Sequence, residues 1–223
     1  MPTEIELKYQ LSANYEKNKT IVADITAMLE TKSITFEMNQ SQLVNDYFDN
    51  DNLDLRKMDF GLRIRTKNRL YEQTIKTAGK VVGCLHQRPE YNINIANGKL
   101  DLSLFPTEIW PDDVNVMGIQ ESLKVIFSTN FSRQTWLIHQ NENIIELALD
   151  EGSICTSFGQ STIAINEIEI ELVQGNEQAL FVLAKQLMSI VKMTPSELSK
   201  AARGYTLYYD EMKNLSTKGI MSN

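Results

Sequence analysis

The chain has 223 residues, of which 42% are hydrophobic and 23% are charged, and its 22 Lys and Arg against 29 Asp and Glu give a formal net charge of −7. This composition is ordinary for a protein with a hydrophobic core and excludes an intrinsically disordered chain. No apolar run approaches the roughly 20 residues of a membrane-spanning helix, residues 1–10 have no apolar signal segment, and the acidic balance argues against a general grip on nucleic acid. We therefore expect a cytoplasmic protein that binds neither membrane nor nucleic acid.

The N-terminal half of the chain is predicted to contain five strands and one helix. Residues 3–9 alternate apolar and polar side chains with period two, as a strand does. Apolar residues next recur at helical spacing, at Ile21, Ile25, Met28 and Leu29. This spacing predicts an amphipathic helix. Alternation then returns in four segments separated by turn-forming residues, which predict strands at 43–49, 61–66, 70–77 and 87–95.

The C-terminal half begins with a short predicted helix and continues into three strands and a longer helix. The short helix is predicted over 119–127, after a turn rich in Pro and Asp. Period-two segments predict strands at 132–139, 143–150 and 162–173. Apolar residues at helical spacing over 180–191 predict the longer helix. Because the strands follow one another closely, they favour an antiparallel meander.

A fourth helix is predicted from a capping box. Thr194 is suited to the N-cap, Pro195 to the first helical position and Glu197 to the third. This helix would carry Lys200 and Arg203 three residues apart in its first turns, so the two side chains would project together. The last residues, 214–223, lack an apolar pattern and are predicted to form a flexible tail, which leaves one domain over 1–213.

Charged side chains occupy one face of nearly every predicted strand. A single strand of this kind is typical of a solvated surface, but repetition in so many strands needs another explanation. Three acids on one strand face repel one another, so solvent, cations or basic side chains must compensate them. The shared faces are those of Glu4, Glu6 and Lys8; Arg63 and Arg65; Glu72, Thr74 and Lys76; Arg88 and Glu90; Glu146, Ala148 and Asp150; and Glu167, Glu169 and Glu171.

Two arrangements would satisfy this pattern. In one, an open sheet turns its charged face to water and the helices cover its apolar face. In the other, about eight strands close into a barrel with a charged interior, and the apolar faces point outward under the helices. The barrel would suit a metal-bound polyphosphate, because guanidinium forks such as Arg63 and Arg65 match phosphate oxygens and clustered carboxylates match Mg²⁺ or Mn²⁺.

The motifs resemble those of one known family. The segment Glu4-Ile5-Glu6-Leu7-Lys8 resembles the ExExK signature of the CYTH superfamily, the triphosphate tunnel metalloenzymes, which includes thiamine triphosphatases, class IV adenylyl cyclases and bacterial inorganic triphosphatases. Further similar stretches follow in family order: GLRIR at 61–65, EQTIK at 72–76, LHQRPEYN at 85–92, FSR at 131–133, IELALDEG at 145–152, EIEIEL at 167–172 and LSKAARGY at 198–205. LHQRPEYN, LSKAARGY and PTEIWP at 106–111 look most like the CYTH domain of bacterial inorganic triphosphatases.

The resemblance implies an α+β fold and an activity. The fold would be a closed antiparallel tunnel of eight strands with helices outside and a C-terminal helix near one end. The activity would be hydrolysis of inorganic triphosphate, a small-molecule substrate, to pyrophosphate and phosphate with Mg²⁺ or Mn²⁺. Thiamine triphosphatase activity, class IV adenylyl cyclase activity and non-catalytic polyphosphate binding are the alternatives. Relatives often carry a C-terminal helical CHAD domain, so we expect an isolated domain or a stand-alone relative.

The resemblance also implies roles for individual residues. The metal ligands would be Glu4, Glu6, Asp150, Glu169 and Glu171, with Glu167 able to replace Glu169 if the alignment slips by one step. The phosphate-binding residues would be Lys8, Arg63, Arg65, Lys76, Arg88, Arg133, Lys200 and Arg203. The residues expected to act in catalysis are Glu4, Glu6, Lys8, Arg63 and Arg65. Glu90 and Glu146 are interpreted as ion-pair partners that orient neighbouring arginines.

Overall fold

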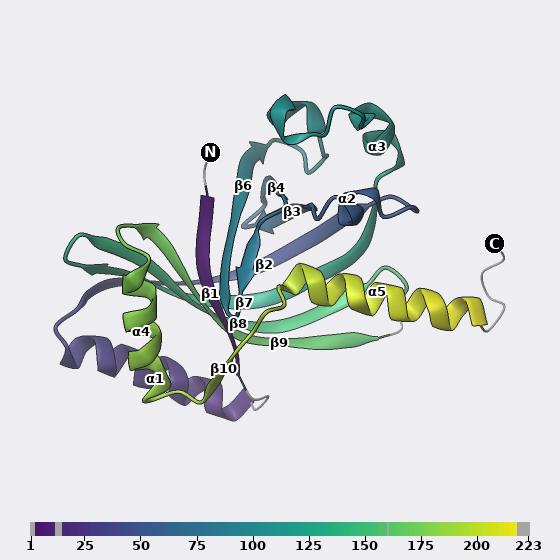
Figure 1. Ribbon diagram of the computed structural model, residues 1–223. Helices are drawn as coiled ribbons and strands as arrows, with labels where there is room; N and C mark the ends of the chain where they lie inside the picture. Colours follow the sequence, from purple (N-terminus) through teal and green to yellow (C-terminus); the bar gives the residue numbers. More distant parts are fainter. Residues whose placement is uncertain (1–2, 12–14, 160, 218–223) are drawn as a thin grey trace.

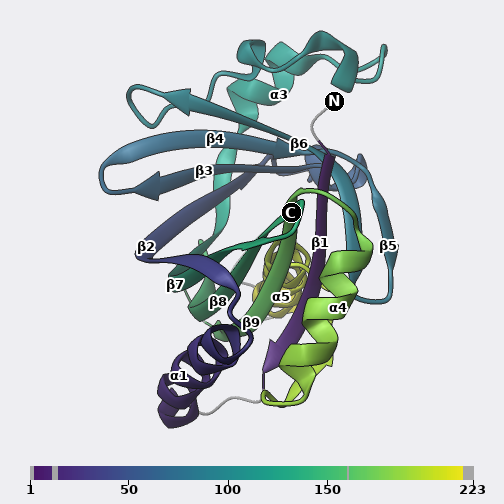
Figure 2. The ribbon, with the colours of Figure 1, turned by 90° about the vertical axis from the view of Figure 1, so that its left-hand side faces the viewer.

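Eight antiparallel strands close into a barrel in the computed structural model, which describes residues 3–11, 15–159 and 161–217. The strand order is β1-β9-β8-β7-β2-β3-β4-β6, and β6 pairs with β1 to close the ring (Figure 2). This confirms the predicted barrel, and the open sheet with a solvated charged face is wrong. The strands are β1 (Thr3–Leu11), β2 (Thr35–Asp49), β3 (Gly61–Lys67), β4 (Leu70–Lys76), β6 (Leu85–Ile95), β7 (Lys124–Gln140), β8 (Asn143–Thr156) and β9 (Thr162–Gln174).

Strand β1 shows why the barrel has a polar interior. Leu7 and Tyr9 are buried in an apolar cluster on the outside of the barrel, whereas Glu4, Glu6 and Lys8 line the cavity inside it. Successive side chains of a strand point to opposite faces, so the period-two pattern of the sequence becomes an apolar exterior and a charged interior. Two short strands extend the sheet at its margins, β5 (Lys80–Val82) beside β6 and β10 (Met193–Pro195) beside β1.

Helices cover the apolar outer faces of the barrel (Figure 1). Helices α1 (Tyr15–Thr31) and α4 (Gln178–Met188) pack over one face, where Ile25, Trp136 and Leu183 belong to one buried cluster. The short helices α2 (Asp54–Lys57), η1 (Leu102–Leu104), η2 (Thr107–Ile109) and α3 (Val116–Ser122) contribute to a second cluster over β3 and β4. In the described part of the chain, no helix combines the length and apolar character needed to cross a membrane.

Helix α5 (Lys200–Thr217) packs closely against β7 and β8. A Cβ atom at Gly204 would lie 2.3 Å from a ring carbon of Phe127, so this close approach requires a glycine. The Phe127 ring also meets Tyr205 edge-on, with the ring centroids 5.4 Å apart. The close approach places the first turn of α5 at the barrel cavity, whose wall includes Lys200.

A buried carboxylate links α5 to α2. Asp49 is fully buried and its oxygens accept hydrogen bonds from the backbone N–H groups of Leu55 (3.0 Å) and Arg56 (3.0 Å) at the start of α2. The same side chain accepts a hydrogen bond from the Tyr205 hydroxyl at 2.9 Å. Asp49 at the end of β2 therefore caps one helix and anchors another.

The helix predicted from the capping box begins later than predicted. The Thr194-Pro195 capping box is wrong, because Met193–Pro195 form β10, in register with Tyr9–Leu11 of β1. The backbone N–H of Ser196 also donates to the carbonyl of Lys8 at 2.9 Å, so pairing with the exposed edge of β1 outweighs the local cap. The helix starts at Lys200, and the hydroxyl of Ser199 accepts a hydrogen bond from the N–H of Ala202 at 3.1 Å.

Other predicted boundaries also differ from the structure, and the strands predicted over 43–49 and 132–139 begin earlier, at Thr35 and Lys124. The helix predicted over 119–127 is α3, which ends at Ser122, and β7 begins at Lys124 because residues 124–127 pair with β2. In the predicted tail, residues 214–217 form the last turn of α5, where Leu215 is buried. Residues 218–223 lie outside the described residues.

Replacing Tyr205 with Phe should lower the free energy of unfolding by about 1–3 kcal/mol, because it removes a hydrogen bond to a buried carboxylate. Urea unfolding followed by circular dichroism measures this loss. Tyr209, on the same helix, is 47% exposed, and Tyr209→Phe should change the stability by less than about 0.5 kcal/mol. Equal effects of the two substitutions would contradict the anchoring role of the Asp49–Tyr205 bond.

Candidate active site

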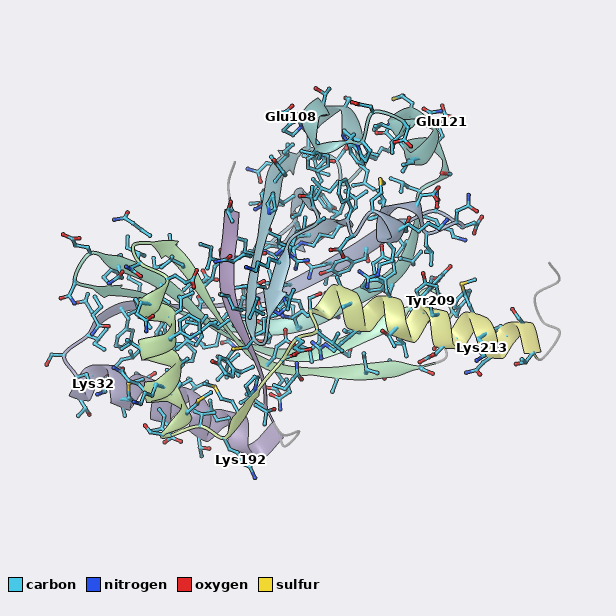
Figure 3. All side chains as sticks on the ribbon, viewed as in Figure 1. Lys32, Glu108, Glu121, Lys192, Tyr209 and Lys213 are labelled. Atoms are coloured by element: carbon cyan, nitrogen blue, oxygen red, sulfur yellow. The ribbon has the colours of Figure 1, made fainter. Side chains whose placement is uncertain are left out.

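The barrel encloses a cavity of about 230 Å³ whose wall is mostly charged. Strands β1, β3, β4, β6 and β7 and helix α5 contribute its basic side chains, and β1, β4, β6, β8 and β9 contribute its acidic ones. Charged groups that are far apart in the sequence therefore converge inside the barrel, whereas Lys32, Glu108 and Lys213 lie on the exposed periphery (Figure 3). The charged wall residues are Lys8, Arg63, Arg65, Lys76, Arg88, Arg133, Lys200, Glu4, Glu6, Glu72, Glu90, Glu146, Glu169 and Glu171.

One acidic group is already neutralised by basic side chains. Asp150, Glu167 and Glu169 each place a carboxylate oxygen within 4.8 Å of the others. Arg133 binds both oxygens of Asp150 at 2.7 Å and one oxygen of Glu169 at 2.6 Å. Lys200 contacts Asp150 at 2.6 Å and also pairs with Glu167. Burial alone would raise the pKa of Asp150, but Arg133 and Lys200 hold it below its usual range.

A second acidic group, on β1 and β9, is less well neutralised. Burial raises the pKa of Glu6; Lys8 acts against this rise, Glu4 and Glu169 add to it, and the pKa lies above its usual value. Its Oε2 accepts from Lys8 at 2.5 Å, but its Oε1 is buried without a partner. Glu171 lies opposite Glu6 in the sheet register, and burial with the nearby Glu4 and Glu6 raises its pKa to about 8. Negative charge is therefore in excess at this part of the wall.

This second group is the better fitted of the two to a divalent cation. Hard cations such as Mg²⁺ are bound by carboxylate oxygens. Glu6 has a free buried oxygen, and Glu171 forms no ion pair within 4.0 Å among the described residues. Glu4 completes the group, although Lys76 already binds both of its oxygens, at 2.6 and 2.7 Å. In contrast, the carboxylates around Asp150 have basic partners that a metal ion would have to displace.

On β3, in contrast, basic side chains lack carboxylate partners. No carboxylate oxygen of the described residues lies within 4.0 Å of the Arg65 guanidinium, whose Nε donates to the amide oxygen of Asn45 at 2.9 Å. Burial, followed by repulsion from Arg63 and Arg133, lowers the pKa of Arg65 to about 10. Among the carboxylates of the described residues, Arg63 has only a long contact with Glu90, at 3.5 Å, and its Nε is buried without a partner there. Positive charge is therefore in excess here, where a bound anion would balance it.

Most of the predicted site residues reach the cavity. The exceptions are Asp150 and Arg203, which are outside its wall. Arg203 pairs with Glu167 and donates to the carbonyl of Ala164 at 3.3 Å. Lys200 and Arg203 thus share Glu167 as a partner, consistent with their predicted joint projection. The predicted roles of all these residues in binding and catalysis stay predictions.

The interpretation of two acidic residues as ion-pair partners is confirmed. Glu90 contacts Lys76 at 2.9 Å in addition to Arg63, and Glu146 lies 3.6 Å from Arg133. The structure also distinguishes two neighbours on β9. Glu169 is part of the cavity wall, whereas Glu167 points its carboxylate to α5 and to Gln10.

Sequence reasoning missed Tyr47. It is buried in the cavity wall and stacks on Phe127 with 4.5 Å between the ring centroids. Burial raises the pKa of Tyr47. The charge of Arg63 and the hydrogen bond that Arg63 shares with the hydroxyl act in the opposite direction, and the pKa lies below its usual value. The period-two pattern places Tyr47 on one face of β2 with Asn45, but neither residue is charged, and the charge pattern therefore did not reveal them.

A closed barrel whose interior holds excess negative charge at one place and excess positive charge at another defines a class of proteins that can bind a polyanion together with a cation. Comparison with known proteins identifies the family. The model of the CYTH domain matches residues 2–205. The chain belongs to the CYTH family.

One relative in sequence and two solved structures are similar to the chain. The inorganic triphosphatase of Haemophilus influenzae is 36% identical over 212 residues, which are 93% of this chain and 55% of that protein, so the chain spans about half the length of that relative. A putative adenylyl cyclase from Hippeastrum, described as having a dominant triphosphatase activity, is 21% identical with a TM-score of 0.62, over 91% of this chain and 95% of that one. A putative adenylate cyclase from Vibrio parahaemolyticus is 16% identical with a TM-score of 0.53, over 88% and 94% of the two chains. These two structures show the shared fold.

The protein in EDTA should become less stable as the pH rises from 6.5 to about 8. The pKa of Glu171 is raised from 4.5 to about 8 in the folded state, so between these values the folded state binds more protons than the unfolded chain. The contribution of Glu171 to the free energy of unfolding therefore falls with rising pH. His86, whose pKa is lowered from 6.5 to about 4 by burial, has the opposite effect, which is complete above pH 6.5. Urea unfolding at several pH values measures the slope.

Glu171→Gln should flatten this slope, since glutamine does not titrate. Glu142→Gln, a change of the same kind at an exposed position, should keep the slope of the wild type. A Glu171→Gln protein with the wild-type slope would show that Glu171 does not carry the raised pKa.

Proposed function

We propose that the protein hydrolyses inorganic triphosphate to pyrophosphate and phosphate with the help of a divalent cation, Mg²⁺ or Mn²⁺. This proposal rests on the separation of charge inside one cavity. Carboxylates exceed their basic partners at Glu6 and Glu171, and guanidinium groups exceed their acidic partners at Arg63 and Arg65. The name of the Haemophilus influenzae relative, an inorganic triphosphatase, supports the same activity. A cytoplasmic location stays a prediction.

The basic residues of the wall suit a linear triphosphate better than a single phosphate. A linear triphosphate carries several negative charges along its length, and one phosphate would not need seven basic side chains around it. Arg63, Arg65 and Arg88 would bind phosphoryl oxygens most readily, because none of them has a close carboxylate partner among the described residues. As charge spreads over the transferred phosphoryl group in the transition state, these guanidinium groups would stabilise it.

The carboxylates of the wall would bind the divalent cation and accept the proton of the attacking water. Glu4, Glu6 and Glu171 would hold the divalent cation, and Glu169, which already binds Lys8 at 2.6 Å, would complete the acidic wall. When bound, such an ion supplies charge neutralisation at phosphate oxygens and activation of water. A carboxylate of Glu4 or Glu6 would accept the proton of the attacking water.

The carboxylates outside the wall would act by positioning basic side chains. Asp150 binds Arg133 through two hydrogen bonds of 2.7 Å, which fixes the plane of that guanidinium. Glu167 contacts Lys200 and Arg203 in the first turn of α5. These contacts favour a positioning role for Asp150 over a role as a metal ligand.

Glu6→Gln should reduce the turnover number for inorganic triphosphate by about 100-fold or more, because it removes a charged ligand and a possible proton acceptor while keeping the shape of the side chain. Phosphate release at saturating Mg²⁺ measures this effect. Glu108→Gln, at an exposed position, should keep the wild-type turnover. A Glu6→Gln protein with near wild-type turnover would contradict the proposed role.

Inorganic triphosphate should be hydrolysed with a higher kcat/KM than ATP or thiamine triphosphate. The aromatic residues of the described wall are Tyr47 and Phe131, and each ring already has a partner. Tyr47 stacks on Phe127, and the Phe131 ring lies 5.1 Å from Lys200 Nζ. Phosphate release from the three substrates, with Mg²⁺ and with EDTA, tests this order.

Each alternative has its own outcome in that assay. A preference for thiamine triphosphate or ATP would favour thiamine triphosphatase or adenylyl cyclase activity. Binding of triphosphate without phosphate release from any of the three would favour a polyphosphate-binding module.

A further inference from the structure

A row of polar side chains crosses three neighbouring strands beside the cavity. Asn45 of β2 lies opposite Arg65 of β3 and also opposite Thr129 of β7. Asn45 and Thr129 are both fully buried. The cross-strand register therefore holds a threonine, an asparagine and an arginine side by side, and the first two are shielded from bulk water.

The hydrogen bonds of this row have one possible direction. The guanidinium of Arg65 can only donate, so the amide of Asn45 must present its oxygen to Arg65 Nε, at 2.9 Å. The Nδ2 group of Asn45 then faces Thr129 and donates to its hydroxyl oxygen at 2.8 Å. Arg65 therefore sets which way the amide faces, and the Thr129 hydroxyl, by accepting from the amide Nδ2, holds Asn45 in place beside Arg65.

Arg65 differs in this respect from other basic groups of the wall. Four of them contact a carboxylate at 2.5 or 2.6 Å, namely Lys8, Lys76, Arg133 and Lys200. The partner of Arg65 is a neutral amide, which orients the guanidinium without cancelling its charge. A carboxylate at the same place would form a charge-assisted pair and compete with a bound anion.

We propose that Asn45 is a positioning residue that directs Arg65 into the cavity and, because it is uncharged, keeps the Arg65 charge available for a phosphoryl oxygen of the substrate. This inference rests on the proposed binding of a triphosphate in the barrel. It assigns to an uncharged residue outside the cavity wall a part in the affinity for the polyanion.

Asn45→Asp is a sharp test, because aspartate has the same shape and can accept hydrogen bonds from both Arg65 and the Thr129 hydroxyl. Binding of inorganic triphosphate, measured by isothermal titration calorimetry in EDTA at fixed ionic strength, should weaken by about tenfold or more. Binding within about twofold of the wild type would overturn the proposal.

A double-mutant cycle shows whether the effect passes through Arg65. In an Arg65→Gln background, adding Asn45→Asp should weaken triphosphate binding further by no more than about twofold. The same tenfold loss in that background would mean that the new carboxylate simply repels the anion, and the proposal would then be wrong.

A pair of substitutions at Thr129 keeps the proposal testable if Asn45→Asp does not fold. Thr129→Val removes the acceptor that fixes the amide and should weaken binding by about threefold or more, whereas Thr129→Ser keeps the hydroxyl and should bind within about twofold of the wild type. Circular dichroism confirms that both variants are folded. Equal binding by the two would overturn the positioning role.

Failure of this inference and failure of the proposed hydrolysis are distinguishable, because binding in EDTA requires no turnover. If the wild type releases no phosphate with Mg²⁺ but Asn45→Asp weakens triphosphate binding, the hydrolysis is refuted and the role of Asn45 stands. If the wild type hydrolyses triphosphate and Asn45→Asp binds it as tightly as the wild type does, the role of Asn45 alone is refuted.

Discussion

Charge compensation inside the barrel is the constraint on which the rest of the structure depends. Removing an ionised side chain from water costs several kcal/mol unless it is paired and hydrogen-bonded. Around Glu169 this demand is met by Lys8, Arg133 and Lys200, which come from three different elements. The strands can keep a polar interior only because their register brings such partners together, and the apolar residues must then be buried outside, under the helices.

The places where charge compensation is incomplete point to the ligand that we propose. Among the described residues, Glu171 has no ion pair within 4.0 Å, and the side-chain partner of the Arg65 guanidinium is a neutral amide. A folded protein tolerates uncompensated buried charge when a ligand of the opposite sign completes the site. A polyanion with its cation would satisfy both places at once, which is why the two imbalances favour one composite ligand over two separate ones.

Periodicity was sufficient to predict which faces of the strands would be charged, and it identified most of the cavity wall. It could not predict register. Glu167 and Glu169 occupy the same face of β9, but they lie opposite different residues of β1, Gln10 and Lys8. This difference in register makes Glu167 a partner of α5 and Glu169 a residue of the cavity wall. It also could not predict that Met193–Pro195 would pair with the edge of β1, because that choice depends on a strand far away in the sequence. The pattern of charges did not identify Asn45 and Tyr47, because neither residue carries a charge.

The closing seam of the barrel affects how the chain can fold. Strand β1, near the beginning of the chain, pairs with β9, and the contact between Lys8 and Glu169 spans 161 positions. Such distant pairings are slow to form because a long loop must be closed before they contribute. Strand β1 can pair with β9 only after β9 has been synthesised, so the charged cavity is completed only in the late steps of folding.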